Sequence, residues 1–132
     1  MSNPPSVRFL KFSLVGAIGI IVQLGALAGL GALRINYLLA TALAVECAIL
    51  HNFLWHRRYT WRDRTQGIRS FLPSLFRFHL CNGLISLAGN LLLMRLLVGV
   101  FNLPPLNANI ATIAVCFAAN FLASDRWVFR AN

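Results

Sequence analysis

One sequence pattern occurs twice in this chain, each time at the end of an apolar stretch. Residues 52–62 and residues 120–130 both begin with Asn-Phe-Leu, and both end in the order Arg-aromatic-x-aromatic-Arg. The offset is constant, since 120 − 52 and 130 − 62 both equal 68. The chain is therefore predicted to be internally duplicated, and each copy closes a segment long enough to cross a bilayer.

The apolar stretches are predicted to be membrane-spanning helices. The first carries no Asp, Glu, Lys or Arg over the 22 residues from Phe12 to Leu33, and a spanning helix needs about 20. Only helices and closed barrels satisfy their backbone in lipid, and these runs lack the alternation of barrel strands. Four spans are predicted, at residues 12–33, 37–55, 78–101 and 106–124. Turns at residues 34–36 and 102–105 and a basic loop at residues 56–74 connect them.

The composition excludes a water-soluble domain and argues against nucleic acid as a partner. The chain is 58% hydrophobic and only 11% charged, whereas soluble domains carry about 25% charged residues. Its net charge is +9, but the basic residues lie beside the apolar stretches rather than along a polar face. This arrangement favours the anionic head groups of membrane lipids as the partner.

The distribution of basic residues predicts the orientation. Ten of the twelve lie before the first span, in the central loop with the start of the third span, or in the carboxyl tail, which leaves Arg34 and Arg95 for the other side. Because cytoplasmic segments are enriched in Lys and Arg, both termini and the loop are expected in the cytoplasm. The predicted fold is an all-α integral membrane four-helix bundle of two parallel-repeat hairpins. It forms one domain over residues 1–132, with repeats at about 8–62 and 75–130.

The chain resembles the GtrA family of small four-helix membrane proteins. The resemblance rests on the Lys-Phe-Ser-Leu-Val-Gly sequence at residues 11–16, on the two basic endings and on the hairpin duplication, and it covers essentially the whole chain. It implies translocation of a polyprenyl-phosphate-linked monosaccharide across the cytoplasmic (inner) membrane, for glycosylation of cell-envelope polysaccharides. The family often carries Asp in the middle of the first span, where this chain has Gln23.

Three polar residues within the spans are candidates for a substrate path. Glu46 lies nine residues into its span, so about 14 Å below the outer surface at 1.5 Å per residue. An ionised acid at that depth costs roughly 2.5–3.5 kcal/mol, so it is expected to face the bundle interior, to pair or to be protonated. Gln23 and Asn90 differ by 67, close to the repeat offset, and lie at similar depth. The alternative is that these groups only hydrogen-bond neighbouring helices.

Recurring polar residues at the cytoplasmic ends are candidates for binding the lipid phosphate or head group. Arginine binds phosphate in a bidentate manner, although the same residues also fit plain topological anchors, and the two Asn residues also fit helix caps. The candidates are Arg58, Arg62, Arg126, Arg130, Asn52 and Asn120. At the outer face, Arg34 and Arg95 are candidates for receiving the phosphate.

Two rows of small residues predict close helix packing, because small side chains let helix backbones approach. They are Gly25 with Gly29, and Ala40 with Ala44 and Ala48.

The chain offers no recognisable catalytic apparatus. It lacks a Ser/His/Asp set, paired carboxylates, a Gly-rich phosphate loop and a metal cluster, so neither an enzyme, a cofactor nor a metal is expected. Two alternatives to translocation remain open: a membrane anchor or partner subunit of a polyprenyl-phosphate glycosyltransferase, and a small proton-coupled multidrug exporter. Four helices enclose little space, so a homo-oligomer or a groove open to lipid is expected rather than a wide channel.

Overall fold

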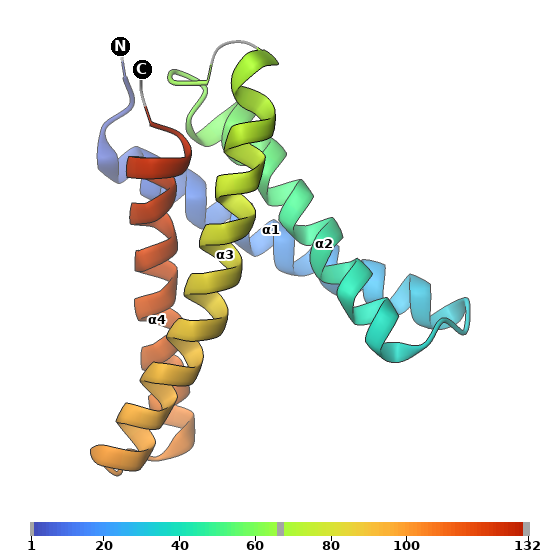
Figure 1. Ribbon diagram of the computed structural model, residues 1–132, viewed down its shortest axis with the longest axis vertical. Coiled ribbons are helices and arrows are strands. Elements are labelled where there is room, and N and C mark those ends of the chain that lie inside the picture. Colours follow the sequence, from blue (N-terminus) through green and yellow to red (C-terminus); the bar gives the residue numbers. More distant parts are fainter. Residues whose placement is uncertain (1, 66–67, 131–132) are drawn as a thin grey trace. The chain divides into compact units, whose positions relative to one another are not determined.

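The computed structural model describes residues 2–65 and 68–130, and over these ranges it contains helices and turns but no strand. The all-α prediction is therefore confirmed. The chain divides into two compact units, residues 1–66 and residues 67–132 (Figure 1). Each unit is a helical hairpin, and each is described by itself below.

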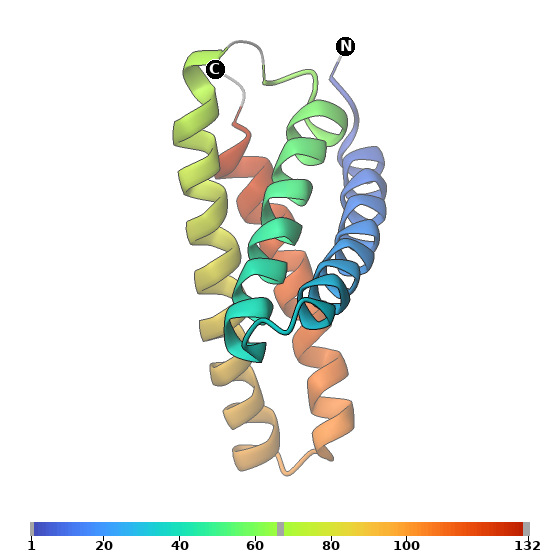
Figure 2. The same ribbon diagram turned by 90° about the vertical axis from the view of Figure 1, so that its right-hand side faces the viewer.

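The first hairpin packs two long helices against each other. Figure 2 shows α1 and α2 joined by a short turn. Its elements are α1 (Pro5–Ala32), α2 (Tyr37–Trp55) and a π-helical turn, η1 (His56–Thr60).

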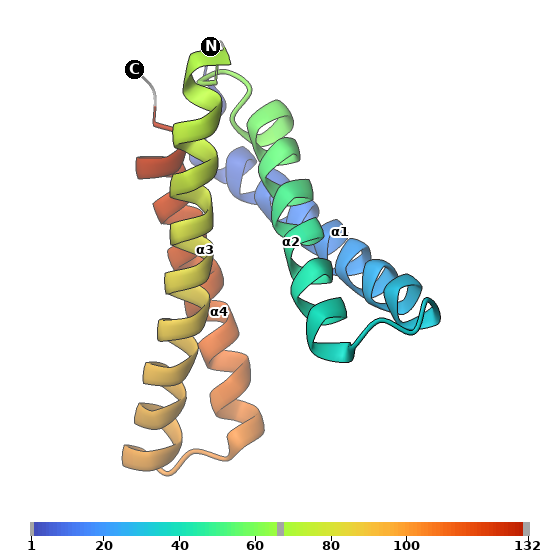
Figure 3. The same cartoon turned by 45° about the vertical axis from the view of Figure 1, so that its right-hand side comes forward.

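The second hairpin also has two long helices followed by a π-helical turn, and it contains two further short turns. Figure 3 shows α3 and α4 side by side along most of their length. Its elements are the 3₁₀ turn η2 (Ile68–Ser70), α3 (Phe71–Met94), the π-helical turn η3 (Arg95–Val100), α4 (Pro105–Ala123) and the π-helical turn η4 (Ser124–Val128).

Three segments of the described chain are long and apolar enough to cross a membrane: Pro5–Ala32, Phe71–Val100 and Asn107–Val128. The remaining helix, α2, has 19 residues. At 1.5 Å per residue it is about 28 Å long, close to the hydrocarbon thickness of a bilayer. The chain is therefore a helical membrane protein.

Two helices begin earlier than the spans predicted from the sequence. The first starts at Pro5 rather than Phe12, and the third at Phe71 rather than Phe78, so the loop predicted at residues 56–74 is much shorter. The predicted spans began directly after a charged residue, Lys11 or Arg77, because charged residues mark the edge of the hydrocarbon core. A helix can continue past that edge because charged side chains are tolerated in the head-group region.

Both hairpin tips contain a residue in the left-handed conformation. Arg34 has φ 57° and Asn102 has φ 54°, and the two positions are 68 residues apart. After α1, the amide of Ile35 donates to the carbonyl of Leu30 and that of Arg34 to Gly31, the two bonds of a Schellman motif. After the second tip, Pro105 opens α4 at a position where a missing amide proton costs nothing.

The buried faces of the two hairpins correspond at fixed offsets. Between α2 with η1 and α4 with η4 the offset is 68, and between α1 and α3 it is 66. The buried pairs at 68 are Ala40 and Ala108, Ala44 and Thr112, Ala48 and Cys116, Phe53 and Phe121, and Trp61 and Phe129; at 66 they are Phe12 and Phe78, and Val15 and Cys81. At the offset of 66, Gln23 corresponds to Gly89 rather than to Asn90, which corrects the pairing suggested by their separation of 67.

The small residues pack closely at only one of the two predicted rows. Ala40, Ala44 and Ala48 are buried along α2, as predicted. The prediction for Gly25 and Gly29 is wrong, because both are exposed and a Cβ there would meet no heavy atom within 4 Å.

A close helix contact lies instead at Gly19, where an added Cβ would collide with the side-chain amide of Asn52. The sequence did not distinguish these glycines, because their positions relative to α2 depend on how the two helices cross.

Candidate functional site

A cavity of about 400 Å³ lies at the end of the first hairpin that carries the start of α1 and the turn η1. It is lined by Asn3, Lys11, Arg58, Tyr59, Arg62 and Asp63. We call it the basic cavity, because three of these six side chains are cations and one is a carboxylate. The structure thus brings Arg58 and Arg62, both predicted from the sequence, to one cavity.

Separate segments of the chain supply the cations of the basic cavity. Lys11 comes from α1 and Arg58 from η1, while Arg62 follows the buried Trp61 at the end of the π-helical turn. The amide of Trp61 donates to the carbonyl of His56 at 2.8 Å, which closes the wide turn and places Arg62 beside the other two cations. The turn therefore positions two of the three cations.

Lys11 is held over Tyr59. Its Nζ donates to the carbonyl oxygen of Tyr59 at 3.4 Å and lies 4.7 Å from the centre of the Tyr59 ring. The ammonium group thus makes a cation–π contact as well as a hydrogen bond. Lys11 was not predicted as a site residue, although it is the only lysine of the chain and stands one position before the first apolar stretch.

The amino-terminal segment is fixed against the loop that follows η1, and both contribute to the lining of the cavity. The amide nitrogen of Asn3 donates to Oδ2 of Asp63 at 3.3 Å, and the guanidinium of Arg8 donates to the carbonyl of Asn3. Asn3 and Asp63 were also missed as site residues. No sequence pattern indicates that Asn3 and Asp63, sixty positions apart, are in contact. Because Asp63 directly follows Arg62, it was interpreted only as a charge partner of the neighbouring arginines.

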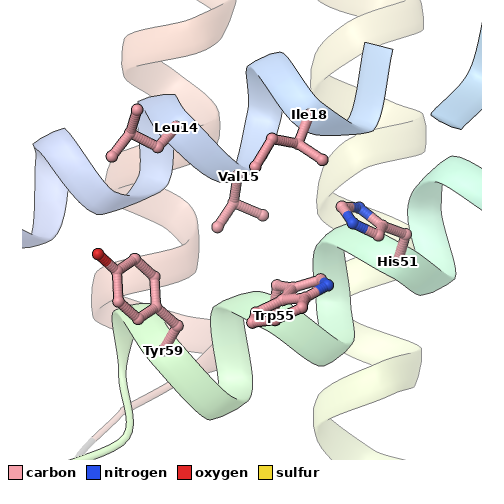
Figure 4. Close-up of a pocket in the computed structure, with 6 residues that line it drawn as sticks. All are labelled: Leu14, Val15, Ile18, His51, Trp55 and Tyr59. Atoms are coloured by element: carbon pink, nitrogen blue, oxygen red, sulfur yellow. The ribbon is translucent and has the colours of Figure 1, made fainter. Parts of the chain in front are cut away.

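An apolar cavity of about 320 Å³ lies next to the basic cavity, and Tyr59 lines both. The other residues around it are Leu14, Val15, Ile18, His51 and Trp55. In Figure 4 the rings of Trp55 and Tyr59 extend from one helix toward the aliphatic side chains of α1. A charged cavity and an apolar cavity that share a wall suit an amphipathic molecule with an anionic head.

A buried aromatic cluster supports the turn η1. The rings of Phe12 and His56 stack at 4.6 Å and 12°, and Trp61 lies edge-on to both. His56 Nδ1 and Thr60 Oγ1 are 3.1 Å apart. His56 follows the second apolar stretch, and burial, with a further contribution from His51, lowers its pKa to about 3. The imidazole therefore stays neutral at physiological pH and packs as an aromatic ring.

The two predicted Asn residues lie in the packing between helices rather than among the residues lining the basic cavity. Asn52 contacts Gly19 on α1, and its Oδ1 is 3.2 Å from His51 Nδ1. Asn120 reaches Oγ of Ser86 on α3 at 3.5 Å. Each Asn therefore bridges the two helices of its own hairpin, which fits the structural alternative better than head-group binding.

The second hairpin repeats the cation–aromatic pair of the first. The guanidinium carbon of Arg77 lies 5.8 Å from the ring centre of Trp127, and these residues correspond to Lys11 and Tyr59 at the offsets of 66 and 68. Arg126 and Arg130 are exposed at the same end of this hairpin.

The three predicted path residues are not gathered by either hairpin. Glu46 is exposed on α2, between the buried Ala44 and Ala48 in sequence but on a different face. Gln23 on α1 and Asn90 on α3 are half-buried and belong to different hairpins. The amide of Asn90 donates to the carbonyl of Ser86, one turn earlier in the same helix. Within its own hairpin Glu46 is exposed, and the expectation that it faces the bundle interior, pairs or is protonated stays a prediction.

The remaining candidates lie near the opposite ends of the hairpins. Arg34 is exposed at the tip of the first hairpin, and Arg95 is exposed at the start of η3 in the second. Among the described residues no group of three or more His, Cys, Asp or Glu side chains is placed to hold a metal ion.

Comparisons with known proteins agree with the fold. The chain is 40% identical over 73 residues to a dolichol-phosphate mannosyltransferase of Pyrococcus furiosus, a match covering 55% of this chain but only 20% of that enzyme. It thus spans about a fifth of the enzyme it matches. It is also 30% identical over 98 residues to the uncharacterised membrane protein YwcD of Bacillus subtilis, covering 74% and 76% of the two chains. Residues 11–129 match the family described as GtrA/DPMS, transmembrane domain, and the chain therefore belongs to that family.

Proposed function

We propose that this protein carries a polyprenyl-phosphate-linked monosaccharide across the cytoplasmic membrane, where the sugar is used to glycosylate cell-envelope polysaccharides. The observation that carries the proposal is the basic cavity, in which Arg58 and Arg62 lie beside an apolar cavity. Membership of a family named for GtrA and DPMS supports a polyprenyl-phosphate sugar as the cargo.

The basic cavity is where the lipid phosphate would be collected. Arg58, Arg62 and Lys11 supply donors that match phosphate oxygens, and the charge-assisted bonds they form are stronger than neutral ones. By the positive-inside rule, this end of the hairpin faces the cytoplasm, the side on which ten of the twelve basic residues are expected. The polyprenyl tail would remain in the bilayer along the exposed apolar faces of the helices.

The sugar would pass outside the first hairpin rather than through it. The space between α1 and α2 is filled by Ala44, Ala48 and the Gly19–Asn52 contact, so it has no room for a hexose. Glu46 lies about halfway along α2 on an exposed face, so a group moving along the surface of the hairpin would meet it. A path of this kind is completed by lipid or by a second copy of the chain, which fits the expected homo-oligomer.

A second candidate function is support of a glycosyltransferase without transport. The match to the mannosyltransferase favours it, because a segment similar to this chain makes up only about a fifth of that enzyme. In this alternative the basic cavity would hold the lipid phosphate for a separate catalytic partner, and the polar residues within the spans would have no role in activity.

The test is the sidedness of a polyprenyl-phosphate hexose in proteoliposomes. Wild-type protein should expose the sugar of the lipid on the far leaflet, and Glu46→Gln should reduce the rate while the protein remains folded. Equal rates for empty vesicles and vesicles with folded wild-type protein would contradict translocation and favour the partner-subunit alternative. An unchanged rate in Glu46→Gln would remove Glu46 from the path but leave translocation intact.

A further inference from the structure

The basic cavity contains a feature that a simple phosphate site does not need. Asp63 places a carboxylate among Lys11, Arg58 and Arg62. Its Oδ2 accepts a hydrogen bond from the amide of Asn3, while its Oδ1 is shielded from solvent and has no hydrogen-bond partner among the described residues. A buried carboxylate oxygen without a donor is costly, so a ligand hydroxyl that displaces the atoms covering Oδ1 and donates to it would gain binding energy.

The requirement for a donor narrows the chemistry of the ligand. An ionised carboxylate can only accept hydrogen bonds, and it repels phosphate oxygens. A bare lipid phosphate is a monoester that carries between one and two negative charges near neutral pH and offers little to the carboxylate. In a glycosylated lipid phosphate the phosphate is a diester with a single charge, and the attached sugar carries hydroxyl donors. The combination of three cations and one carboxylate therefore suits the glycosylated form.

The part of the cavity formed by Asn3 and Asp63 is held in place before any ligand binds. Asn3 is fixed by its bond to Asp63 and by the bond that its carbonyl accepts from Arg8. Rigid placement of Asp63 lowers the entropy lost when a hydroxyl group is bound.

The neighbouring apolar cavity accounts for the lipid part of the ligand. It shares Tyr59 with the basic cavity and continues along α1 past Val15 and Ile18. A chain leaving the phosphate at Arg58 would meet Tyr59 and Trp55 within the same hairpin, since Arg58 and Trp55 also line a further cavity of about 340 Å³.

We infer that the basic cavity is a head-group site for a polyprenyl-phosphate sugar and that Asp63 is its specificity residue. Lys11, Arg58 and Arg62 hold the phosphate, and Asp63 accepts a hydrogen bond from a sugar hydroxyl. Asp63 thereby favours the glycosylated lipid over the bare lipid phosphate. This inference rests on the proposed function for the class of its ligand, but it concerns binding and does not require transport.

The experiment compares the binding of three lipids to the full chain in phosphatidylcholine nanodiscs. The probes are a polyprenyl-phosphate hexose, the corresponding polyprenyl phosphate and phosphatidylglycerol. Wild-type protein should bind the hexose lipid most tightly. Asp63→Asn should weaken the hexose lipid roughly tenfold, the scale of one lost hydrogen bond to a charged group, and should not weaken the bare phosphate. Asparagine can still accept the bond from Asn3, so the wall of the cavity is preserved.

Two further variants separate the roles. Arg62→Gln should weaken the hexose lipid and the bare phosphate alike, because it removes a phosphate contact. Asp125→Asn is the matched control, because Asp125, like Asp63, is adjacent in sequence to a repeated arginine but lies in the second hairpin. This control should change neither affinity.

The inference is overturned if Asp63→Asn weakens both polyprenyl lipids equally, since that result indicates a structural role. It is also overturned if phosphatidylglycerol binds wild type as tightly as the hexose lipid, since the cavity is then a general site for anionic lipids. Selective binding without any translocation would contradict the proposed function and leave the inference standing. Translocation without a lipid preference that depends on Asp63 would support the proposed function and contradict the inference.

Discussion

The two hairpins pack their helices in the same way but carry different side chains at several corresponding positions. Their buried rows, the π-helical turns η1 and η4 and the left-handed tips correspond at fixed offsets. At the same offsets, Ala114 corresponds to Glu46, Ser124 to the neutral His56, and Ile85 to Gly19. The comparison teaches that the recurring buried residues maintain helix packing, whereas Glu46, His56 and Gly19 distinguish the first hairpin at positions that do not recur.

The largest expected effect on stability comes from replacing Gly19 with isoleucine, the residue found at the corresponding position 85 of the second hairpin. In Gly19→Ile, the new side chain would meet the Asn52 amide on α2 and force the two helices apart. We expect a loss of about 3 kcal/mol in the free energy of unfolding, at the upper end for overpacked sites. Reversible unfolding in detergent, followed by circular dichroism, measures it.

Gly25→Ile is the matched control for this variant, because a Cβ at Gly25 meets nothing within 4 Å. It should change the free energy of unfolding by less than Gly19→Ile does. If the two variants were equally destabilised, the cost would come from isoleucine in a helix, and the close contact with Asn52 would not explain it.

The next largest effect is a dependence of stability on pH that only the first hairpin should show. The folded-state pKa of His56 is lowered to about 3 from the ordinary 6.5, so below pH 6.5 the unfolded chain binds a proton that the folded chain excludes. Stability is therefore full above that pH and falls as the pH decreases. Between about pH 7.5 and about pH 5 the loss should be about 2 kcal/mol.

Substitution of His56 isolates this contribution. His56→Ser introduces the residue found at the corresponding position of the second hairpin, and it should flatten the pH profile while lowering stability throughout. Unfolding curves at several pH values give both quantities. A profile for His56→Ser as steep as that of wild type would assign the pH dependence to another group.

A smaller effect, on lipid binding, is expected when the repeated arginines are substituted one at a time. Arg58→Gln should weaken binding of a polyprenyl-phosphate hexose roughly tenfold, the scale of one charge-assisted bond, because Arg58 lines the basic cavity together with Lys11 and Arg62. Arg126→Gln in the second hairpin should have a smaller effect, since Ala131 stands in the sequence where the first hairpin has Asp63. Equal losses in binding to nanodiscs would indicate two equivalent phosphate sites.

The helical fold and most helix ends could be predicted from the sequence, because the bilayer imposes a simple length rule on apolar segments. The second helix was predicted at residues 37–55 and is found at Tyr37–Trp55. The pairing of Arg58 with Arg62 was also accessible, since both residues occur in the repeated ending. Residue type and spacing along one chain segment were sufficient for these predictions.

The rest of the candidate site depends on contacts between distant segments. Asn3 reaches Asp63 across sixty positions, and Lys11 reaches Tyr59 across forty-eight. Neither contact has a periodic signature in the sequence. The face of α2 that carries Glu46 could not be predicted for a related reason, because a single charge in an apolar span does not indicate which face of the helix packs.

The smallest expected effect lies at the two hairpin tips, where the same conformation is held by different residues. Arg34 and Asn102 both have positive φ, which costs most residues roughly 1 kcal/mol but costs Asn less and Gly almost nothing. Arg34→Gly should therefore stabilise its hairpin by up to about 1 kcal/mol, and Asn102→Gly by less. The two variants compared by thermal unfolding give the difference directly. If Arg34→Gly were destabilising, the exposed guanidinium would have a stabilising contact at the membrane surface that outweighs the strain, and its candidacy as the outer phosphate contact would gain support.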